Sequence, residues 1–247
     1  MNAKSMSTDR DLQDEVIRYL ADAGRKPSAI LNATEAEKAQ CFSRFLARRY
    51  YRDRLQRAFR YSRKWLVDHQ EQLGEIVDSP EFDAFLSGCV LGSLTSAREV
   101  GEMAMSQLLQ ARVPGPWWPE LLQYEFAFFV QLASSEIESP SETPRVAKST
   151  IYSEFSWKMP ALLTALKSGQ VPDETLRGRT LLLFSRTRHG KIFVVELDAA
   201  ALALLNAVKG ERSIAEIASV ARLSEGDARR ILTSLKEIGA VLLPSGE

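Results

Sequence analysis

The sequence predicts a mainly α-helical protein with a small α+β part, in which an N-terminal helical bundle is followed by a winged-helix-like domain. Two observations predict this fold class. Apolar residues recur at helical spacing in several segments before residue 136. Between residues 181 and 243, two short runs of β-formers precede three helical segments and a last β-rich run. The order strand, strand, three helices, strand is typical of a small winged-helix module.

The elements of this module follow from local signals. Residues 181–184 and 191–197 are β-rich and flank a Gly-containing turn, which predicts a hairpin. Asp198 is placed to cap a helix that ends at Gly210. Ser213 and Glu216 have capping-box spacing, and Ser224 repeats the start signal before a third helix. Residues 240–243 then return as a strand.

The first half of the chain predicts helices at 9–23, from Thr34 onward with a turn or kink near Tyr50, and at 80–96, 98–111 and 120–136. Pro119 suits the first turn of the last of these helices. The segment 44–64 is rich in arginine, with aromatic residues between the cations. Such a segment suits nucleic acid, phosphate or an acidic protein surface; alternatively, its arginines pair with carboxylates from later helices.

The polar, proline-containing stretch after residue 135 predicts a boundary. We therefore expect a helical domain at 1–135, a linker at 136–150 and a recognition domain at 151–247. The aromatic arm with Tyr152, Phe155 and Trp157 precedes a short helix at 160–167 and is expected to pack on the C-terminal module.

Composition limits the function. Lys plus Arg and Asp plus Glu both number 32, so the formal net charge is zero, whereas dedicated nucleic-acid or membrane-surface binders usually carry a basic excess. Two cysteines far apart in sequence form no disulfide framework, which fits a reducing compartment. No signal peptide and no apolar run of membrane-spanning length is evident. These features predict a soluble cytoplasmic protein.

Catalytic motifs are not evident. His69 and His189 lie in polar contexts without a second ligand at metal spacing, and Cys41 and Cys89 lack a neighbouring histidine. There is no Gly-rich phosphate loop and no nucleophile elbow. We therefore expect no enzyme activity in this chain.

Three functions remain open for the small module. It could read DNA through its third helix, although Glu225 and Asp227 at the start of that helix would face phosphates. It could add an extended peptide to the edge of its hairpin. It could also be a scaffold whose helices serve only its own core.

The module also resembles a known family. The runs VELDAA at 195–200, LLNAVKG at 204–210, SIAEI at 213–217 and LKEIGAVL at 235–242 resemble the PqqD-like leader-peptide recognition domains (RiPP recognition elements) of ribosomally made, modified peptides. In that family the leader pairs as an extra strand between the third strand and the third helix. The segments YRDRL at 51–55, FDAF at 82–85 and LLQYEFA at 121–127 are similar to the helical domain of partner subunits of multinuclear non-haem iron oxygenases.

Together the two resemblances imply a non-catalytic accessory subunit that forms a heterodimer with an iron oxygenase and presents a precursor or carrier peptide to it. The resemblance is to partner proteins such as those of 3-thiaglutamate biosynthesis, where the iron enzyme excises the β-carbon of a peptide cysteine, and more distantly to the methanobactin partner. It implies that iron belongs to the partner enzyme and that this chain holds no cofactor. A winged-helix transcriptional regulator is the alternative.

The expected peptide-binding residues are on the hairpin and the third helix: Arg186, Arg188, Lys191, Phe193, Val194, Val195, Glu196, Ala228, Arg229, Ile231, Leu232 and Leu235. The arginine-rich helix and the Trp-Trp turn are expected to dock on the partner enzyme through Arg48, Tyr51, Arg52, Trp117 and Trp118.

Overall fold

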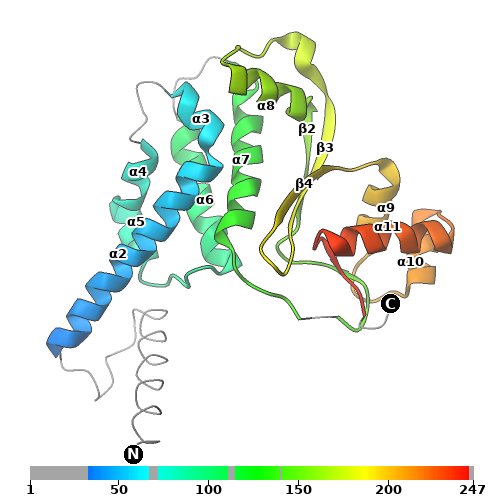
Figure 1. The fold of residues 1–247 in the computed structure, drawn as a ribbon, viewed down its shortest axis with the longest axis horizontal. Helices are drawn as coiled ribbons and strands as arrows, with labels where there is room; N and C mark the ends of the chain where they lie inside the picture. The colour runs from blue at the N-terminus through cyan, green and yellow to red at the C-terminus, as the bar shows by residue number, and fades with distance from the viewer. Residues whose placement is uncertain (1–32, 67–71, 111–114, 140, 245–247) are drawn as a thin grey trace, which may run out of the picture.

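A three-stranded antiparallel sheet lies between two groups of helices in the computed structural model of the protein (Figure 1). The structure describes residues 33–66, 72–110, 115–139 and 141–244. The helix expected at 9–23 lies outside these residues. The described part is mainly helical with a small amount of strand, as the sequence predicts.

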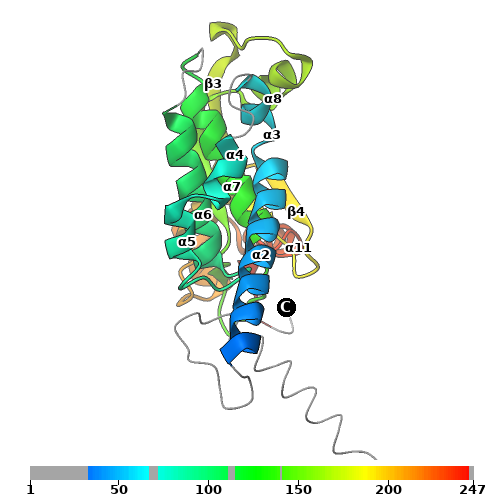
Figure 2. The ribbon, with the colours of Figure 1, turned by 90° about the vertical axis from the view of Figure 1, so that its left-hand side faces the viewer.

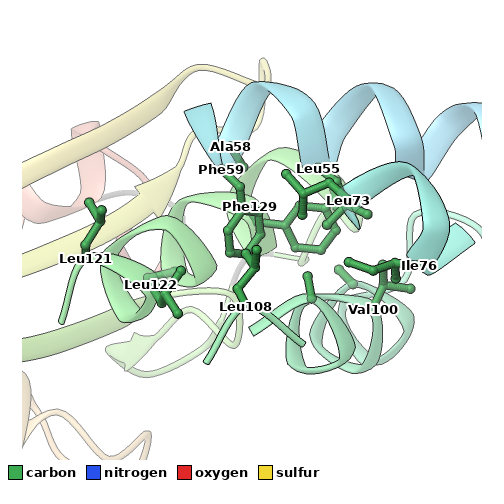
Figure 3. Packing of buried hydrophobic residues seen from close by; sticks show 14 of the residues in the cluster. Leu55, Ala58, Phe59, Leu73, Ile76, Val100, Leu108, Leu121, Leu122 and Phe129 are labelled. Atoms are coloured by element: carbon green, nitrogen blue, oxygen red, sulfur yellow. The ribbon is translucent and has the colours of Figure 1, made fainter. Parts of the chain in front are cut away.

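The N-terminal group is a bundle built around one apolar helix, α7. Figures 1 and 2 show α2, α6 and α7 running side by side, with α3 at the end of α2 and the short helices α4 and α5 beside α2 and α6. Leu121, Leu122 and Phe129 of α7 are buried in the core (Figure 3). An almost entirely apolar helix is stable only when it is enclosed on most sides. The bundle helices are α2 (Ala33–Ala58), α3 (Arg60–Trp65), α4 (Gln72–Val77), α5 (Pro80–Phe85), α6 (Leu94–Leu109) and α7 (Trp118–Ala133).

Two helix boundaries in the bundle differ from the prediction. The helix expected at 80–96 ends at Phe85, and α6 begins separately after Ser93, whose side chain accepts a hydrogen bond from the Ser96 N–H at 3.1 Å. The long N-terminal helix runs through Tyr50 without a break and stops one residue before Phe59. The apolar spacing predicted the longer helices, but it missed α4 and could not identify which serine begins a helix.

The sheet consists of β2 (Ile151–Trp157), β3 (Arg177–Arg186) and β4 (Ile192–Glu196), in the order β2-β3-β4. Successive side chains of β3 face opposite sides because a strand has a two-residue period. Leu182 and Phe184 belong to the core of the bundle, whereas Leu183 belongs to the core of the C-terminal helices. The sheet is thus buried on both faces, which explains the continuous apolar run of β3.

The aromatic arm does not pack where the sequence predicted. It forms β2, which pairs with β3, but Phe155 and Trp157 are buried in the core of the bundle. The helix after it, α8 (Met159–Ser168), ends at Gly169 as predicted and also buries its apolar face there. A short 3-10 helix, η1 (Glu174–Leu176), then leads into β3.

The segment 136–150, expected to be a linker, contributes a strand. In it, β1 (Arg145–Val146) pairs with β5 (Val241–Leu242) in an antiparallel two-stranded sheet. The chain between α7 and β2 therefore passes under the hairpin and is held against the end of the C-terminal module (Figure 1). This pairing joins residues almost a hundred positions apart, so no local signal predicts it.

The C-terminal helices begin at the predicted capping residues. They are α9 (Ala199–Ala207), α10 (Ile214–Ala221) and α11 (Glu225–Glu237). The Asp198 side chain accepts from the Ala201 N–H at 2.7 Å, and Ser213 with Glu216 forms a complete capping box. Ser224 accepts from the Asp227 N–H at 3.1 Å. The three helices share one core with Leu183 and Leu197 of the hairpin, and the elements follow the predicted order of strand, strand, three helices and strand.

Replacing Gly239 by alanine is expected to destabilise the fold strongly. Gly239 follows α11 with a φ of 78°, and an added Cβ would lie 2.3 Å from the Arg186 carbonyl oxygen. The left-handed backbone alone costs about 1–2 kcal/mol for a residue with a side chain, and the clash with backbone adds to that. We expect the free energy of unfolding in urea to fall by several kcal/mol.

Gly210 provides a matched control for this prediction. Its φ is 84°, but an added Cβ would meet nothing nearer than Arg145 Cβ at 3.5 Å. Gly210→Ala therefore isolates the conformational cost. Equal losses in Gly239→Ala and Gly210→Ala would show that α11 does not press against the end of β3.

Candidate functional site

The outer edge of β4 is the site that the hairpin creates. Within the described residues, β4 pairs only with β3, so its other edge carries no strand. The turn between the two strands is closed by Gly190, which has a φ of 82° and donates its N–H to the Thr187 carbonyl at 2.9 Å. Such an edge presents backbone donors and acceptors in a row.

The register identifies which backbone groups face outward. The Leu197 N–H donates to the Leu181 carbonyl and the Thr187 N–H donates to the Lys191 carbonyl, both at 2.9 Å. Hydrogen-bonded pairs alternate with non-bonded pairs in an antiparallel ladder. Lys191, Phe193, Val195 and Leu197 therefore bond toward β3. The intervening residues Ile192, Val194 and Glu196 direct their N–H and C=O groups to the free edge.

The side chains of β4 are apolar and only half-buried. Val194 packs toward the bundle and Val195 toward the C-terminal helices. Ile192 and Phe193 are likewise half-buried, and Glu196 is exposed. A strand of this composition at a sheet edge leaves apolar surface that a further strand would cover.

A cavity of about 610 Å³ adjoins the hairpin end of β4. One wall is the hairpin, and a second is the C-terminal end of α11 with β5. The third wall is the chain that leaves α7, at residues 134–138, together with Ala147 and Ser149. The charged and apolar side chains that line the cavity include Arg186, Arg188, His189, Lys191, Phe193, Lys236, Glu237, Glu136, Ile137, Glu138 and Leu243.

The hairpin wall of this cavity is basic. Within the part of the chain that the structure describes, Arg186, Arg188 and Lys191 form no ion pair. The Lys191 Nζ lies 4.7 Å from the centre of the Phe193 ring. Burial raises the pKa of Tyr50 on α2, and the charges of Arg54 and Arg186 partly offset that rise.

The apolar residues of α11 that were expected to bind peptide need correction. Ala228, Leu232 and Leu235 are buried in the core of the C-terminal helices, and Ile231 packs half-buried against it. Their apolar side chains therefore stabilise the module and do not line an open groove. The exposed Arg229 is 3.2 Å from Glu225, one turn earlier on the same helix.

The residues expected to dock on a partner enzyme are engaged within the chain. Tyr51, Trp117 and Trp118 are 0%, 0% and 4% exposed, so they offer no surface. Arg52 makes a bidentate pair with Asp78 at 2.9 and 2.8 Å, and Arg48 pairs with Asp83. The alternative interpretation, in which these arginines pair with carboxylates from later helices, is the one that the structure bears out for both.

Exposed apolar surface lies instead on the first half of α2. Phe42 and Phe45 are 59% and 57% exposed, and Leu46 is 37% exposed. These residues are three and four positions apart, so they share one face of the helix. They belong to the apolar spacing of this helix, and their exposure could not be predicted because spacing does not reveal where a helix extends beyond its neighbours.

Residues on two walls of the cavity were not predicted from the sequence. Glu136, Ile137 and Glu138 were assigned to a linker, and Lys236 and Glu237 carried no role. The only sequence signal for residues 136–138 was the polar stretch itself. The pairing of β1 with β5 brings this stretch to the hairpin, and no local signal predicts that pairing. His189 is exposed in the turn, as predicted, and His69 lies outside the described residues.

Neither a metal cluster nor a membrane span is found among the described residues. No group of three or more His, Cys, Asp or Glu side chains there is arranged to hold a metal ion. No helix in that part of the chain combines the length and the apolar character needed to cross a bilayer. In comparisons with known proteins, no protein-family model matches the chain and no curated protein is significantly similar to it.

Proposed function

We propose that this chain is a non-catalytic accessory subunit that binds a precursor peptide along β4 and presents it to an iron-dependent oxygenase. The observation that carries the proposal is the free edge of β4, where Ile192, Val194 and Glu196 direct backbone groups outward. A peptide that adds as a strand gains affinity from these groups without a strict sequence requirement. Leader peptides are flexible, and the cost of ordering them limits affinity to moderate values.

The third helix favours peptide binding over DNA binding. A recognition helix presents its first turn to base edges, and in α11 that turn carries the exposed carboxylates of Glu225 and Asp227. The two arginines that follow lie close to these carboxylates, Arg229 to Glu225 at 3.2 Å and Arg230 to Asp227 at 3.0 Å. The helix therefore offers DNA little unpaired positive charge.

The partner enzyme is proposed from the resemblance of the helical bundle. The matching segments at 51–55, 82–85 and 121–127 contribute Tyr51, Phe82 and Leu121 to the core. They therefore support a bundle similar to that of the oxygenase partner subunits, and they give no support for a similar docking surface. The exposed face with Phe42, Phe45 and Leu46 is the apolar surface that such a bundle offers to a second subunit.

Amide hydrogen exchange tests the peptide site directly. With a precursor peptide encoded beside this gene, we expect the outward N–H groups of Ile192, Val194 and Glu196 to exchange more slowly by at least about tenfold. The Phe193 and Val195 N–H groups already bond to β3 and serve as internal controls. Exchange at the three outward amides that is unchanged by every such peptide would overturn the proposal.

A further inference from the structure

The cavity beside the hairpin has an uneven distribution of charge. Arg186, Arg188 and Lys191 on the hairpin face it without an ion pair among the described residues. Of the acids opposite, Glu138 pairs with Arg145 at 2.7 Å and Glu136 accepts the Leu94 N–H at 2.8 Å. These two carboxylates are already engaged.

The ends of α11 and of the hairpin add further titratable groups. Lys236 and Glu237 at the end of α11 line the cavity with opposite charges, and His189 lies in the turn. Among the described lining residues, the hairpin wall therefore carries three cations and no acid, and the two acids of the wall formed by residues 134–138 are already engaged. Apolar side chains, among them Ile137, Phe193 and Leu243, line the space between them.

The free edge of β4 leads into this space. A strand added to β4 lies about 4.8 Å from it and advances about 3.4 Å per residue. Any guest that continues past Ile192 reaches Lys191 and the turn within one or two residues. The same guest residues then lie at the cavity, because Phe193 of β4 and the adjacent Lys191 line it with their side chains.

We propose that this cavity binds acidic side chains of the captured peptide, directly outside the segment that pairs with β4. The recognised sequence is then an alternating apolar stretch followed, at the hairpin end, by Asp or Glu. Arginine suits this role because its planar fork binds a carboxylate through two parallel hydrogen bonds. The inference rests on the proposed strand addition and specifies which peptides the edge selects.

Peptide selection on the full-length protein provides the test. Random 12-residue peptides displayed without a free C-terminus are selected on the immobilised wild-type protein and on the Arg188→Glu/Lys191→Glu variant. Both substituted residues are exposed, so the fold is expected to persist. A control with the same change in net charge is Arg57→Glu/Arg63→Glu, at exposed positions of α2 and α3 remote from the hairpin.

We expect wild type and control to enrich peptides with Asp or Glu at a fixed distance from an apolar alternating stretch. The hairpin variant is expected to lose this preference or to favour Lys and Arg. For a resynthesised peptide, replacing its acids by Asn or Gln, or using the hairpin variant, should raise the Kd by about tenfold, as expected for a charge-assisted contact.

The outcomes separate this inference from the function on which it depends. Apolar alternating peptides without an acidic preference would overturn the cavity's role and leave strand addition in place. Resynthesised peptides whose Kd is unchanged when their acids are replaced by Asn or Gln would likewise overturn the side-chain proposal. No enriched peptide at all would overturn both.

Discussion

Replacing Val194 by proline is expected to abolish precursor binding while the protein stays folded. The Val194 N–H points away from β3, so its loss removes no hydrogen bond of the sheet. The proline ring occupies the space through which a guest strand would approach and removes the central donor of the edge. We expect the Kd of the precursor, measured by fluorescence anisotropy, to rise by about 100-fold or more, since a buried guest carbonyl is left unpaired.

Two neighbouring variants define the mechanism. Val194→Ala keeps the N–H and removes only apolar contact, so its Kd should change by less than about tenfold. Val195→Pro removes an N–H that bonds to β3, so it should lower the free energy of unfolding whether or not peptide is present. Wild-type affinity in Val194→Pro would show that the peptide does not bind as an added strand.

The contrast between positions 194 and 195 could not be derived from the sequence. The β-formers and the Gly-containing turn predicted the hairpin, and both positions were equivalent members of one apolar run. Which of them bonds inward depends on the turn geometry, which fixes the register of Leu181 with Leu197. The sequence therefore predicted the edge but not the direction of its hydrogen bonds.

Elements with local start and stop signals were the most predictable. Asp198, Ser213 and Ser224 cap helices because their side chains bond to backbone two or three residues away, and that chemistry is written in the sequence. The pairing of β1 with β5 depends on contacts across the chain. The position of the aromatic arm also depends on contacts across the chain, because the sequence does not determine which face of the sheet buries Trp157.

The docking prediction failed at its aromatic residues for a related reason. Tyr51 and Trp117 stand among arginines and prolines, a context typical of binding surfaces. In the fold, Tyr51 packs edge-on against Phe82 and Phe85, and Trp117 packs against Trp65. Large aromatic side chains bury the most apolar area, so burying them in the core contributes most to the stability of a bundle of short helices.

One residue that the sequence did not single out has a large energetic role. Glu125 lies in the apolar helix α7 and, unlike Glu120 of the same helix, is fully buried. Its Oε1 accepts the Tyr61 N–H at 2.7 Å and the Ser62 N–H at 3.3 Å, where α3 begins after the break at Phe59. These donors are unsatisfied within a helix that starts there, so Glu125 stabilises the junction between α2 and α3.

Burial makes this carboxyl sensitive to pH. Desolvation raises the pKa of Glu125 from its ordinary value of 4.5 to about 8, and the hydrogen bonds from Ser62 and Tyr61 act in the opposite direction. Between these two values the folded protein holds a proton that the unfolded chain releases. The free energy of unfolding therefore falls as pH rises through this window, by up to about 1.4 kcal/mol per pH unit, and levels off above about pH 8.

Replacing Glu125 by glutamine is expected to remove this dependence. The amide keeps an acceptor for the Tyr61 N–H but cannot ionise, so urea unfolding of Glu125→Gln should be flatter between pH 5 and 8 than that of wild type. At pH 8.5 the variant should be the more stable of the two, because wild type must bury a charge there. Glu125→Ala leaves the backbone donors unpaired and should lose several kcal/mol at every pH.

Glu102→Gln is the control, since Glu102 is exposed on α6 and should follow the wild-type pH profile. Parallel profiles for wild type and Glu125→Gln would mean that the Glu125 carboxyl ionises with its ordinary pKa, and hence that water reaches it. The break between α2 and α3 would then be hydrated and not sealed by α7. Because α7 also packs on the sheet that carries β4, Glu125 and the proposed peptide-binding edge are connected through a single helix.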